Sequence, residues 1–401
     1  MSASHPGEDL RPVTTKLWTP VFKVLLVISL LGIILSMYRF VAGIGATSAM
    51  NDGYAWGSWK VLNVIVLTAV GSGGYAMALI VYVLNKGRYH PLVRTAVLTS
   101  ALGYTTGAIA LTVDIGRPWN MFQMGMPWQW NLHSVLFEIA ICVSLYLVFL
   151  WIEMAQPILE QLSKDKEARG LKAIAIKAGP WIDRYFVWIV ATAILLPTLH
   201  QSSLGSLFLL AGPRLNSLWQ TPFLPLLFLL SCYAVGYAAV VLASQLSALA
   251  WETPVDNRML SSLSRVMGWV LVLFLVVRWM DVIYRGALTS PGAQGMYRYL
   301  FYTETLLLLI PAVALQSRKL REDAGTSMRL SILIVIGGCL YRLDAALIGF
   351  MPGTNFKYFP SVIELLITLG FVAMGVAGYI YFVKRFPILA ARYTPRAATS
   401  D

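Results

Sequence analysis

Charged side chains recur inside the long apolar runs of this 401-residue sequence. Asp114 and Arg117 occur in TVDIGRPWN, where a helix would place them three residues apart on one face. Glu138 lies in the apolar stretch HSVLFE. Since an ionised side chain in lipid is costly and commonly marks an ion or substrate path, these residues predict redox or proton chemistry near one face of a membrane.

A second group of charges lies later in the sequence. It comprises Arg278, Asp281, Arg285, Glu304, Arg342, Asp344 and Glu364. Such residues can neutralise one another and fix the helix register, or they can serve an ion path. The structural interpretation is favoured for Arg278, Asp281, Arg342 and Asp344, whereas a functional role is favoured for Glu138.

Glu153 is the next carboxylate after Glu138 in the same apolar run. It would lie about 22 Å further along a helix that rises ~1.5 Å per residue. The two carboxylates could mark the ends of a proton route, with Tyr146 and water between them. The alternative for Glu153 is an ordinary helix-end carboxylate near the cytoplasmic headgroups.

His200 lies among hydroxyl side chains in LLPTLHQSSLGSL, which includes Ser203. A neutral imidazole in such surroundings can hydrogen-bond a quinone carbonyl and donate a proton when the quinone is reduced. The alternative is a buried histidine that a neighbouring helix satisfies. His133 is expected closer to the membrane interface, at the level of the headgroups.

Resident metal cofactors are limited by the histidines and cysteines. Cys142, Cys232 and Cys339 lack the paired spacing of an iron–sulfur or zinc site. Only His133 and His200 are available to ligate a haem, because the other two of the four histidines fall in a tail and a cytoplasmic loop. Two haems are thereby excluded, and a cytochrome b with a single haem remains an alternative.

The composition indicates the elements that must position these residues. The chain is 58% hydrophobic and 12% charged, with a mean hydropathy of +0.68, as in polytopic membrane proteins. Runs long enough to cross about 30 Å of hydrocarbon occupy 21–43, 59–84, 93–115, 131–154, 183–211, 222–250, 264–285, 297–316, 328–350 and 361–384. The sequence therefore predicts an all-α protein with ten transmembrane helices.

The distribution of basic residues predicts the orientation. Most of the 31 lysines and arginines fall in the tails and the even-numbered loops, which places both termini in the cytoplasm. We expect tails at 1–20 and 386–401, a membrane domain over 21–385, and a location in the bacterial inner membrane. The net charge of +12 then reflects topology and anionic lipid, so nucleic acid is not an expected partner. The stretch LKAIAIKAG in the loop 155–182 is expected to lie on the membrane surface.

The acidic residues also indicate an internal duplication. Asp114 and Asp281 are separated by nearly the same number of residues as Glu138 and Glu304, and each pair joins helices four apart in the order. We therefore expect two related four-helix bundles, helices two to five (59–211) and six to nine (222–350).

The predicted outer loop at 116–131, GRPWNMFQMGMPWQWN, is rich in tryptophan and methionine and has no acidic residue. So apolar a loop suggests a docking surface for another protein. The alternative is the aromatic belt found at membrane interfaces.

Five segments carry a family resemblance: NDGYAWGSW (51–59), VYVLNKGRYHPLVR (81–94), TVDIGRPWN (112–120), NLHSVLFE (131–138) and LLPTLHQSSLGSL (195–207). Together they resemble the NrfD/PsrC-type family of quinone-reactive membrane subunits, over nearly the whole chain. Within that family the likeness is greatest to the membrane subunits of periplasmic nickel-iron hydrogenases of the hydrogenase-2 kind.

The resemblance implies a ten-helix subunit in which the first and last helices flank the two bundles, without haem or an iron–sulfur cluster of its own. It implies electron transfer from an outward-facing ferredoxin-like iron–sulfur subunit, linked to the nickel-iron hydrogenase large and small subunits, to menaquinone from the lipid pool. We expect the quinone site to include Asp114, Arg117, His133, His200 and Ser203. Glu138 and Glu153 are the expected proton path.

Two alternatives to a hydrogenase subunit stay open at this point. One is the NrfD-type anchor of another quinone-linked complex, with a molybdenum or multihaem catalytic subunit. The other is a secondary transporter, for which duplication and buried charges are also typical. Against a transporter, the charges do not converge on the membrane midplane, and the helix centres hold few breaks besides GSGG at 71–74 and Pro197.

Overall fold

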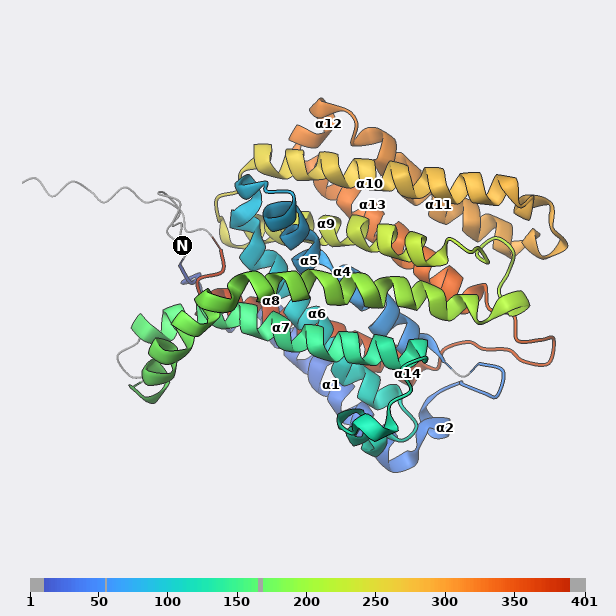
Figure 1. The fold of residues 1–401 in the computed structure, drawn as a ribbon, viewed down its shortest axis with the longest axis horizontal. Coiled ribbons are helices and arrows are strands. Elements are labelled where there is room, and N and C mark those ends of the chain that lie inside the picture. Colours follow the sequence, from blue (N-terminus) through green and yellow to red (C-terminus); the bar gives the residue numbers. More distant parts are fainter. Residues whose placement is uncertain (1–10, 55, 165–168, 390–401) are drawn as a thin grey trace, which may run out of the picture.

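The computed structural model describes residues 11–54, 56–164 and 169–389, and these ranges are almost entirely helical (Figure 1). Most of the expected C-terminal tail and the first half of the N-terminal tail lie outside them. Within these ranges β-structure is limited to two isolated bridges, Asn51 with Tyr54 and Leu215 with Phe350. The predicted all-α class is confirmed.

Nine of the helices described are long and apolar enough to cross a membrane. They are α1 (Pro20–Ala42), a broken helix (Ser58–Val83), α6 (Val93–Asp114), α7 (Val135–Lys164), α8 (Arg169–Leu209), α9 (Leu224–Trp251), α10 (Asn257–Tyr284), α13 (Ala324–Leu343) and α14 (Val362–Arg385). The predicted eighth span corresponds to α11 (Met296–Ala314), which packs against α10 and α13. Its mean hydropathy is below that of the nine apolar helices, so α11 is not counted among them. The ten-span count therefore stays a prediction.

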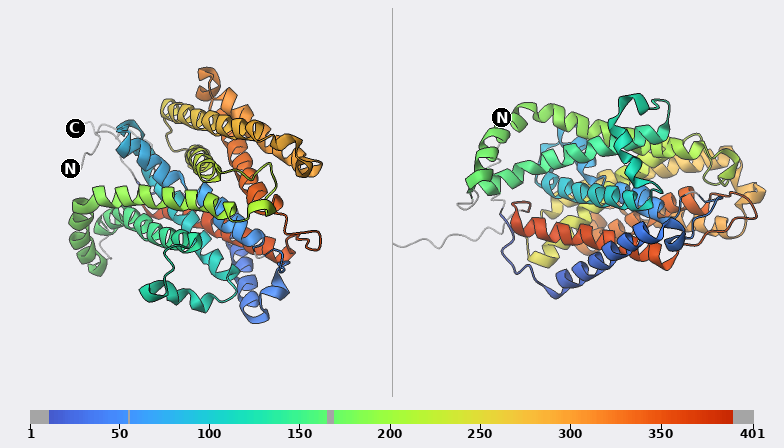
Figure 2. Two further views of the ribbon diagram at one scale, coloured as in Figure 1. Left: turned by 45° about the vertical axis from the view of Figure 1, so that its right-hand side comes forward. Right: turned by 90° about the horizontal axis from the view of Figure 1, so that it is seen from below.

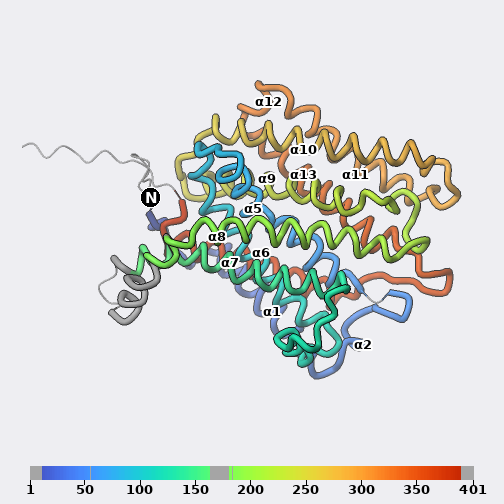
Figure 3. The backbone as a smooth tube through the Cα atoms, viewed as in Figure 1, coloured from blue at the N-terminus to red at the C-terminus, as the bar shows by residue number. Residues whose placement is uncertain are grey.

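The long helices lie roughly side by side, so their ends form two opposite ends of the molecule (Figures 1 and 3). The N-terminal segment before α1 meets the end of α14, where the Val13 amide donates to the Val383 carbonyl over 3.1 Å. The chain therefore enters and leaves the bundle at one end, which we call the predicted cytoplasmic end. The opposite end, with the loops 43–57, 115–134 and 349–361, is the predicted outer end.

The predicted second span is broken in the middle. It consists of α3 (Ser58–Lys60), the π-helical η1 (Val61–Val66), α4 (Leu67–Val70), α5 (Gly73–Ala78) and the π-helical η2 (Leu79–Val83). The turn between α4 and α5 falls in the sequence GSGG, where the Ser72 hydroxyl donates to the Cys232 carbonyl of α9 over 2.7 Å. That side-chain contact anchors the turn in the membrane interior, where water is scarce.

The predicted surface stretch LKAIAIKAG is the beginning of a longer helix. Residues 171–179 form the first turns of α8, which continues through Pro180 to Leu209. Helices α7 and α8 pack against each other as a long hairpin, visible in green in Figure 1. The hairpin therefore extends the bundle at its predicted cytoplasmic end.

The first and last long helices pack on each other and, through α14, on α6 (Figure 2). Gly32 and Gly370 lie at their crossing, where a Cβ added to Gly32 would come 2.7 Å from the Cα of Gly370. Only glycine allows the two backbones to approach so closely.

Helix α9 joins the two halves of the sequence. It packs against α10 and α13 from the later half, and against α8, α4 and α5 from the earlier half. The division into two four-helix bundles stays a prediction, but α9 would make contacts between such bundles, together with α13, which packs on the broken helix.

Candidate functional site

The end of α6 separates Asp114 from Arg117, two residues that were expected on one helical face. Helix α6 ends at Asp114, and Ile115 is extended. Arg117 is exposed and precedes the 3₁₀ segment η4 (Pro118–Gly125). The expectation that Asp114 and Arg117 share a helix face is therefore wrong, because GRP interrupts the helix one turn too early.

Asp114 instead pairs with a lysine from the broken helix. The Lys60 Nζ lies 3.3 Å from Oδ2 of Asp114, whose side chain is only 1% exposed. The buried Arg39 of α1 donates to the Ile115 carbonyl over 2.6 Å and faces the same carboxylate. Lys60 and Arg39 both lie inside apolar runs of the sequence. This position could have indicated that they neutralise a buried carboxylate such as Asp114.

Glu138 and Ser203 are brought together from α7 and α8. The Ser203 hydroxyl donates to Oε1 of Glu138 over 2.8 Å and also to the Leu199 carbonyl. Glu138 is exposed in the first turn of α7, while Ser203 is buried. An exposed carboxylate that is hydrogen-bonded to a buried hydroxyl can pass protons between a ligand at the surface and the interior of the bundle.

His200 lies one turn before Ser203 and is fully buried. Its Nε2 is 3.1 Å from the Tyr104 hydroxyl of α6 and 2.9 Å from the Gln201 amide nitrogen. Gln201 also donates to the Thr68 hydroxyl of α4 over 3.2 Å. Nε2 of His200 therefore shares hydrogen bonds with two side chains, and the tautomer of the imidazole decides which partner donates.

Aromatic residues lie between this network and the predicted cytoplasmic end, and the hydroxyl of one of them, Tyr146, is buried without a hydrogen-bond partner. The rings of Tyr104 and Tyr146 meet edge to face with centroids 4.7 Å apart. Glu153, two turns further along α7, lines a cavity of about 100 Å³ together with Tyr82, His90 and Arg94. Its Oε1 is buried without a hydrogen-bond partner. Glu153 is therefore a cavity residue rather than a carboxylate among headgroups.

The predicted quinone residues do not surround one point. His200 contacts Tyr104, which lies ten residues before Asp114 on α6, or about 15 Å along the helix at ~1.5 Å per residue. His133 is exposed just before α7, as expected for the interface. The structure thus joins Glu138, Ser203 and His200 through neighbouring positions, and places Asp114, Arg117 and His133 elsewhere at the predicted outer end.

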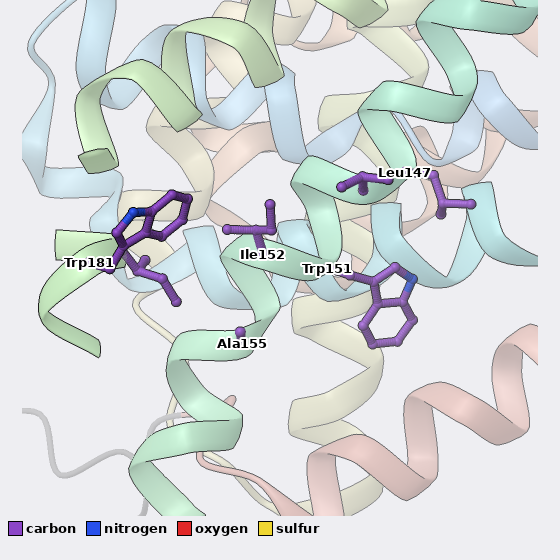
Figure 4. Close-up of a pocket in the computed structure, with 7 residues that line it drawn as sticks. Leu147, Trp151, Ile152, Ala155 and Trp181 are labelled. Atoms are coloured by element: carbon purple, nitrogen blue, oxygen red, sulfur yellow. The ribbon is translucent and has the colours of Figure 1, made fainter. Parts of the chain in front are cut away.

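A larger apolar hollow of about 600 Å³ opens between α7 and α8 near their predicted cytoplasmic ends (Figure 4). Its walls are Leu147, Val148, Trp151, Ile152, Ala155, Trp181 and Ile182. These side chains present almost no polar atom to the hollow, so it suits a hydrocarbon chain and cannot orient a quinone headgroup.

Arg278 and Asp281 are each paired with an opposite charge, as the structural interpretation expects, whereas Arg342 and Asp344 have no oppositely charged hydrogen-bond partner among the described residues. Arg278 of α10 bridges to Glu304 of α11, and Arg285 bridges to Asp281 over 2.6 Å. Arg342 differs, because its guanidinium donates to the carbonyls of Ile65 and Phe228 over 3.0 and 2.6 Å. That cation links the broken helix to α9 and α13 and lies near the His200 network.

Glu364 fixes the loops at the predicted outer end. Its carboxylate accepts hydrogen bonds from the Ala49 amide at 2.6 Å, from the Ser58 hydroxyl at 2.8 Å and from the Tyr358 hydroxyl. Burial, followed by the bond to Glu364, raises the pKa of Tyr358 well above its usual value. Tyr358 therefore stays protonated as a donor, and Glu364 serves the fold rather than proton transfer.

The predicted docking loop is open to its surroundings. It consists of two 3₁₀ segments, η4 and η5 (Pro127–Gln129), none of whose residues is buried. Trp119, Phe122 and Trp128 are each at least 60% exposed. We call this surface the aromatic loop.

Comparison with known proteins gives matches along most of the chain. The family described as "Polysulphide reductase, NrfD" matches residues 46–349. The chain is 36% identical to the "Probable Ni/Fe-hydrogenase 2 b-type cytochrome subunit" of Escherichia coli, over 92% of this chain and 91% of that protein.

Two more distant relatives are also membrane subunits of redox enzymes. One is the "Menaquinone reductase, integral membrane subunit" of Nitratidesulfovibrio vulgaris, 27% identical over 82% of this chain and 81% of that protein. The other is a putative membrane subunit of a dimethyl sulfoxide reductase from Halobacterium salinarum, 22% identical over 95% of this chain and 93% of that protein. With apolar helices throughout and these matches, the chain is a multi-pass membrane protein that belongs to the NrfD family.

Proposed function

We propose that this chain is the quinone-reducing membrane subunit of a hydrogenase complex whose catalytic part faces outward. The observation that carries the proposal is the buried His200–Tyr104 pair, which lies one helical turn along α8 from Ser203, the hydrogen-bond partner of the exposed Glu138. The relatives support the reaction class, since one is named a hydrogenase subunit and another a menaquinone reductase.

In this proposal menaquinone enters from the lipid beside Glu138 and Ser203. Two electrons arrive from a ferredoxin-like iron–sulfur partner, and two protons reach the quinone oxygens through side chains of this chain. Ser203 and Glu138 contact the headgroup, while Tyr104 and His200 pass protons behind it. Asp114, Arg117 and His133 would border the entrance on the predicted outer side, with Asp114 already neutralised by Lys60.

The protons come from the cytoplasm in this proposal. Glu153 collects them from its cavity, and Tyr146, Tyr104 and water carry them toward His200. Each charge that crosses the membrane then stores about 2.3 kcal/mol per 100 mV of membrane potential. The aromatic loop would receive the iron–sulfur partner, because its apolar side chains lie at the end where the electrons must enter.

The subunit holds no haem in this proposal, although the Escherichia coli relative is named a b-type cytochrome subunit. The Nε2 of His200, the atom that would ligate iron, is occupied by Tyr104 and Gln201. A single haem would give a Soret band in the reduced purified chain that is lost in His200→Gln. We expect no such band in the wild type.

The test uses the complete complex in liposomes with hydrogen and a menaquinone analogue. His200→Gln is expected to abolish quinone reduction while dye reduction by the hydrogenase continues, and Glu322→Gln, at an exposed carboxylate paired with Arg318, serves as the control. Unchanged quinone reduction in His200→Gln would refute the site. Copurification with a molybdenum or multihaem subunit instead of hydrogenase would leave the proposed quinone site unchanged. It would show that the chain belongs to another quinone-linked complex.

A further inference from the structure

The later half of the chain contains a buried acidic pair that the proposed reaction does not use. Glu304 of α11 and Asp344 of the π-helical segment η9 (Asp344–Ile348) face each other, and both are at most 1% exposed. Arg278 reaches this pair from α10 and bridges to Oε1 of Glu304. The Trp219 indole donates to Oε2 over 3.3 Å.

The hydrogen bonds are distributed unequally between the two carboxyl groups. Glu304 accepts from Arg278 and Trp219, whereas neither oxygen of Asp344 meets a donor from the described residues. A buried, ionised carboxylate without donors is strongly disfavoured. A protonated Asp344 has a different option, because its hydroxyl can donate to Glu304.

The charges around Glu304 and Asp344 also favour a protonated Asp344. Among the residues that the structure describes, Arg278 is the one cation in contact, while Asp281, one turn away, is neutralised by Arg285. Arg342, near in sequence, directs its guanidinium to the carbonyls of Ile65 and Phe228. Tyr341 faces Arg278 as a neutral ring. Two carboxyl groups and one guanidinium are electrically neutral only when the pair keeps one proton.

The position of the pair repeats that of Glu138. In the earlier half of the chain, Glu138 of α7 takes its hydrogen bond from Ser203 near the end of α8. In the later half, Glu304 of α11 meets Asp344 at the end of α13. Asp344 therefore occupies in the later half the place that Ser203 occupies in the earlier half. Arg278 and one bound proton balance the added negative charge.

We propose that Glu304 and Asp344 form a proton-binding site that holds one proton between them against Arg278. The ligand is a proton, and the site is separate from the His200 network. Its expected resting state is a neutral Asp344 that donates to an ionised Glu304.

Infrared difference spectroscopy of the purified complex at pH 8 tests this proposal. The wild type is expected to show the carbonyl stretch of a protonated carboxyl group, shifted in heavy water and lost in Asp344→Asn. Asparagine matches the neutral acid in size, so this variant should fold. Glu322→Gln is the control, since Glu322 is an exposed carboxylate paired with Arg318.

Glu304→Gln provides a second variant with its own expected result. It leaves Asp344 ionised beside Arg278, so the same band should disappear from its spectrum. If the spectra of Asp344→Asn and the wild type are identical in the protonated-carboxyl region, Asp344 is ionised at rest and the proposal fails. The result does not depend on quinone reduction, which is measured separately.

Discussion

Tyr104 connects the polar residues that lie deepest in the first half of the chain. Its hydroxyl meets His200 at 3.1 Å and Gln201 at 3.5 Å, and its ring packs against Tyr146. The side chain is fully buried, so its contacts with His200 and Gln201 are sheltered from bulk solvent. A single hydroxyl thus joins the proposed proton route to the proposed quinone site.

Tyr104→Phe is expected to lower quinone reduction about 100- to 10,000-fold, since a positioned proton donor contributes a factor of this order. The phenyl ring keeps its packing, so the thermal stability of the complex should change little. Tyr379→Phe, which removes a hydroxyl bonded to Ser247 elsewhere, is the control. Equal rates in all three proteins would place Tyr104 outside the route.

Lys60→Met is expected to destabilise the subunit, because it leaves Asp114 buried without its nearest cation. Breaking a fully buried pair costs about 3–5 kcal/mol, and less is expected here since Lys60 is 30% exposed. The double variant Lys60→Met/Asp114→Asn removes both charges and should recover most of the lost melting temperature. A double variant no more stable than Lys60→Met would show that the pair does not interact.

These residues show what the sequence could and could not predict. Glu138, Ser203 and His200 stand out in the sequence because ionisable or hydroxyl groups are rare in apolar runs. Their partners come from helices far away in the chain, so the contacts with Tyr104 and Thr68 depend on packing. The predicted Asp114–Arg117 pair failed for a local reason, since the helix ends before the arginine.

Close backbone contacts decide how the elements pack. Ser72 and Gly73 of the broken helix lie against Gly236 of α9, and Gly32 lies against Gly370. The helical runs could be predicted from apolar length alone, but GSGG proved to be a full break with π-helical segments on both sides. Hydropathy could not show that break, because every residue around it remains apolar or small.

Gly370→Val is expected to separate α1 from α14, since the added side chain would overlap the backbone of Gly32. The measurement is disulfide crosslinking between cysteines placed on the two helices, which should fall sharply. Gly375→Ala on the same helix is the control, because a Cβ there makes ordinary contact with Thr106 at 3.6 Å. Persistent crosslinking in Gly370→Val would show that a valine side chain fits between α1 and α14 at their crossing.

The whole molecule has two unlike ends. One carries the start of α1, the end of α14 and most of the basic residues that the structure describes; the other carries the aromatic loop and the ends of the helices with Asp114, Glu138, Glu304 and Glu364. The redox partner and the quinone site are therefore expected at the predicted outer end, and proton uptake is expected at the predicted cytoplasmic end.

The orientation can be measured with a membrane-impermeant thiol reagent in intact cells. Gly125→Cys, in the aromatic loop, should react from outside, whereas Gly87→Cys should react only after the membrane is opened. Both positions are exposed and have free space for a side chain. The native Cys142 and Cys232 are buried and should contribute little background. The reverse labelling pattern would invert the predicted topology.

The pairing of α1 with α14 has a consequence for biosynthesis. Helix α1 is the first to leave the ribosome, and its partner is the last, about 320 residues later by their boundaries. At roughly 5–20 residues per second, α1 waits tens of seconds with the face around Gly32 uncovered in the bilayer. Insertion of this subunit therefore requires that α1 be sheltered, by the translocation machinery or by a chaperone, until the chain is complete.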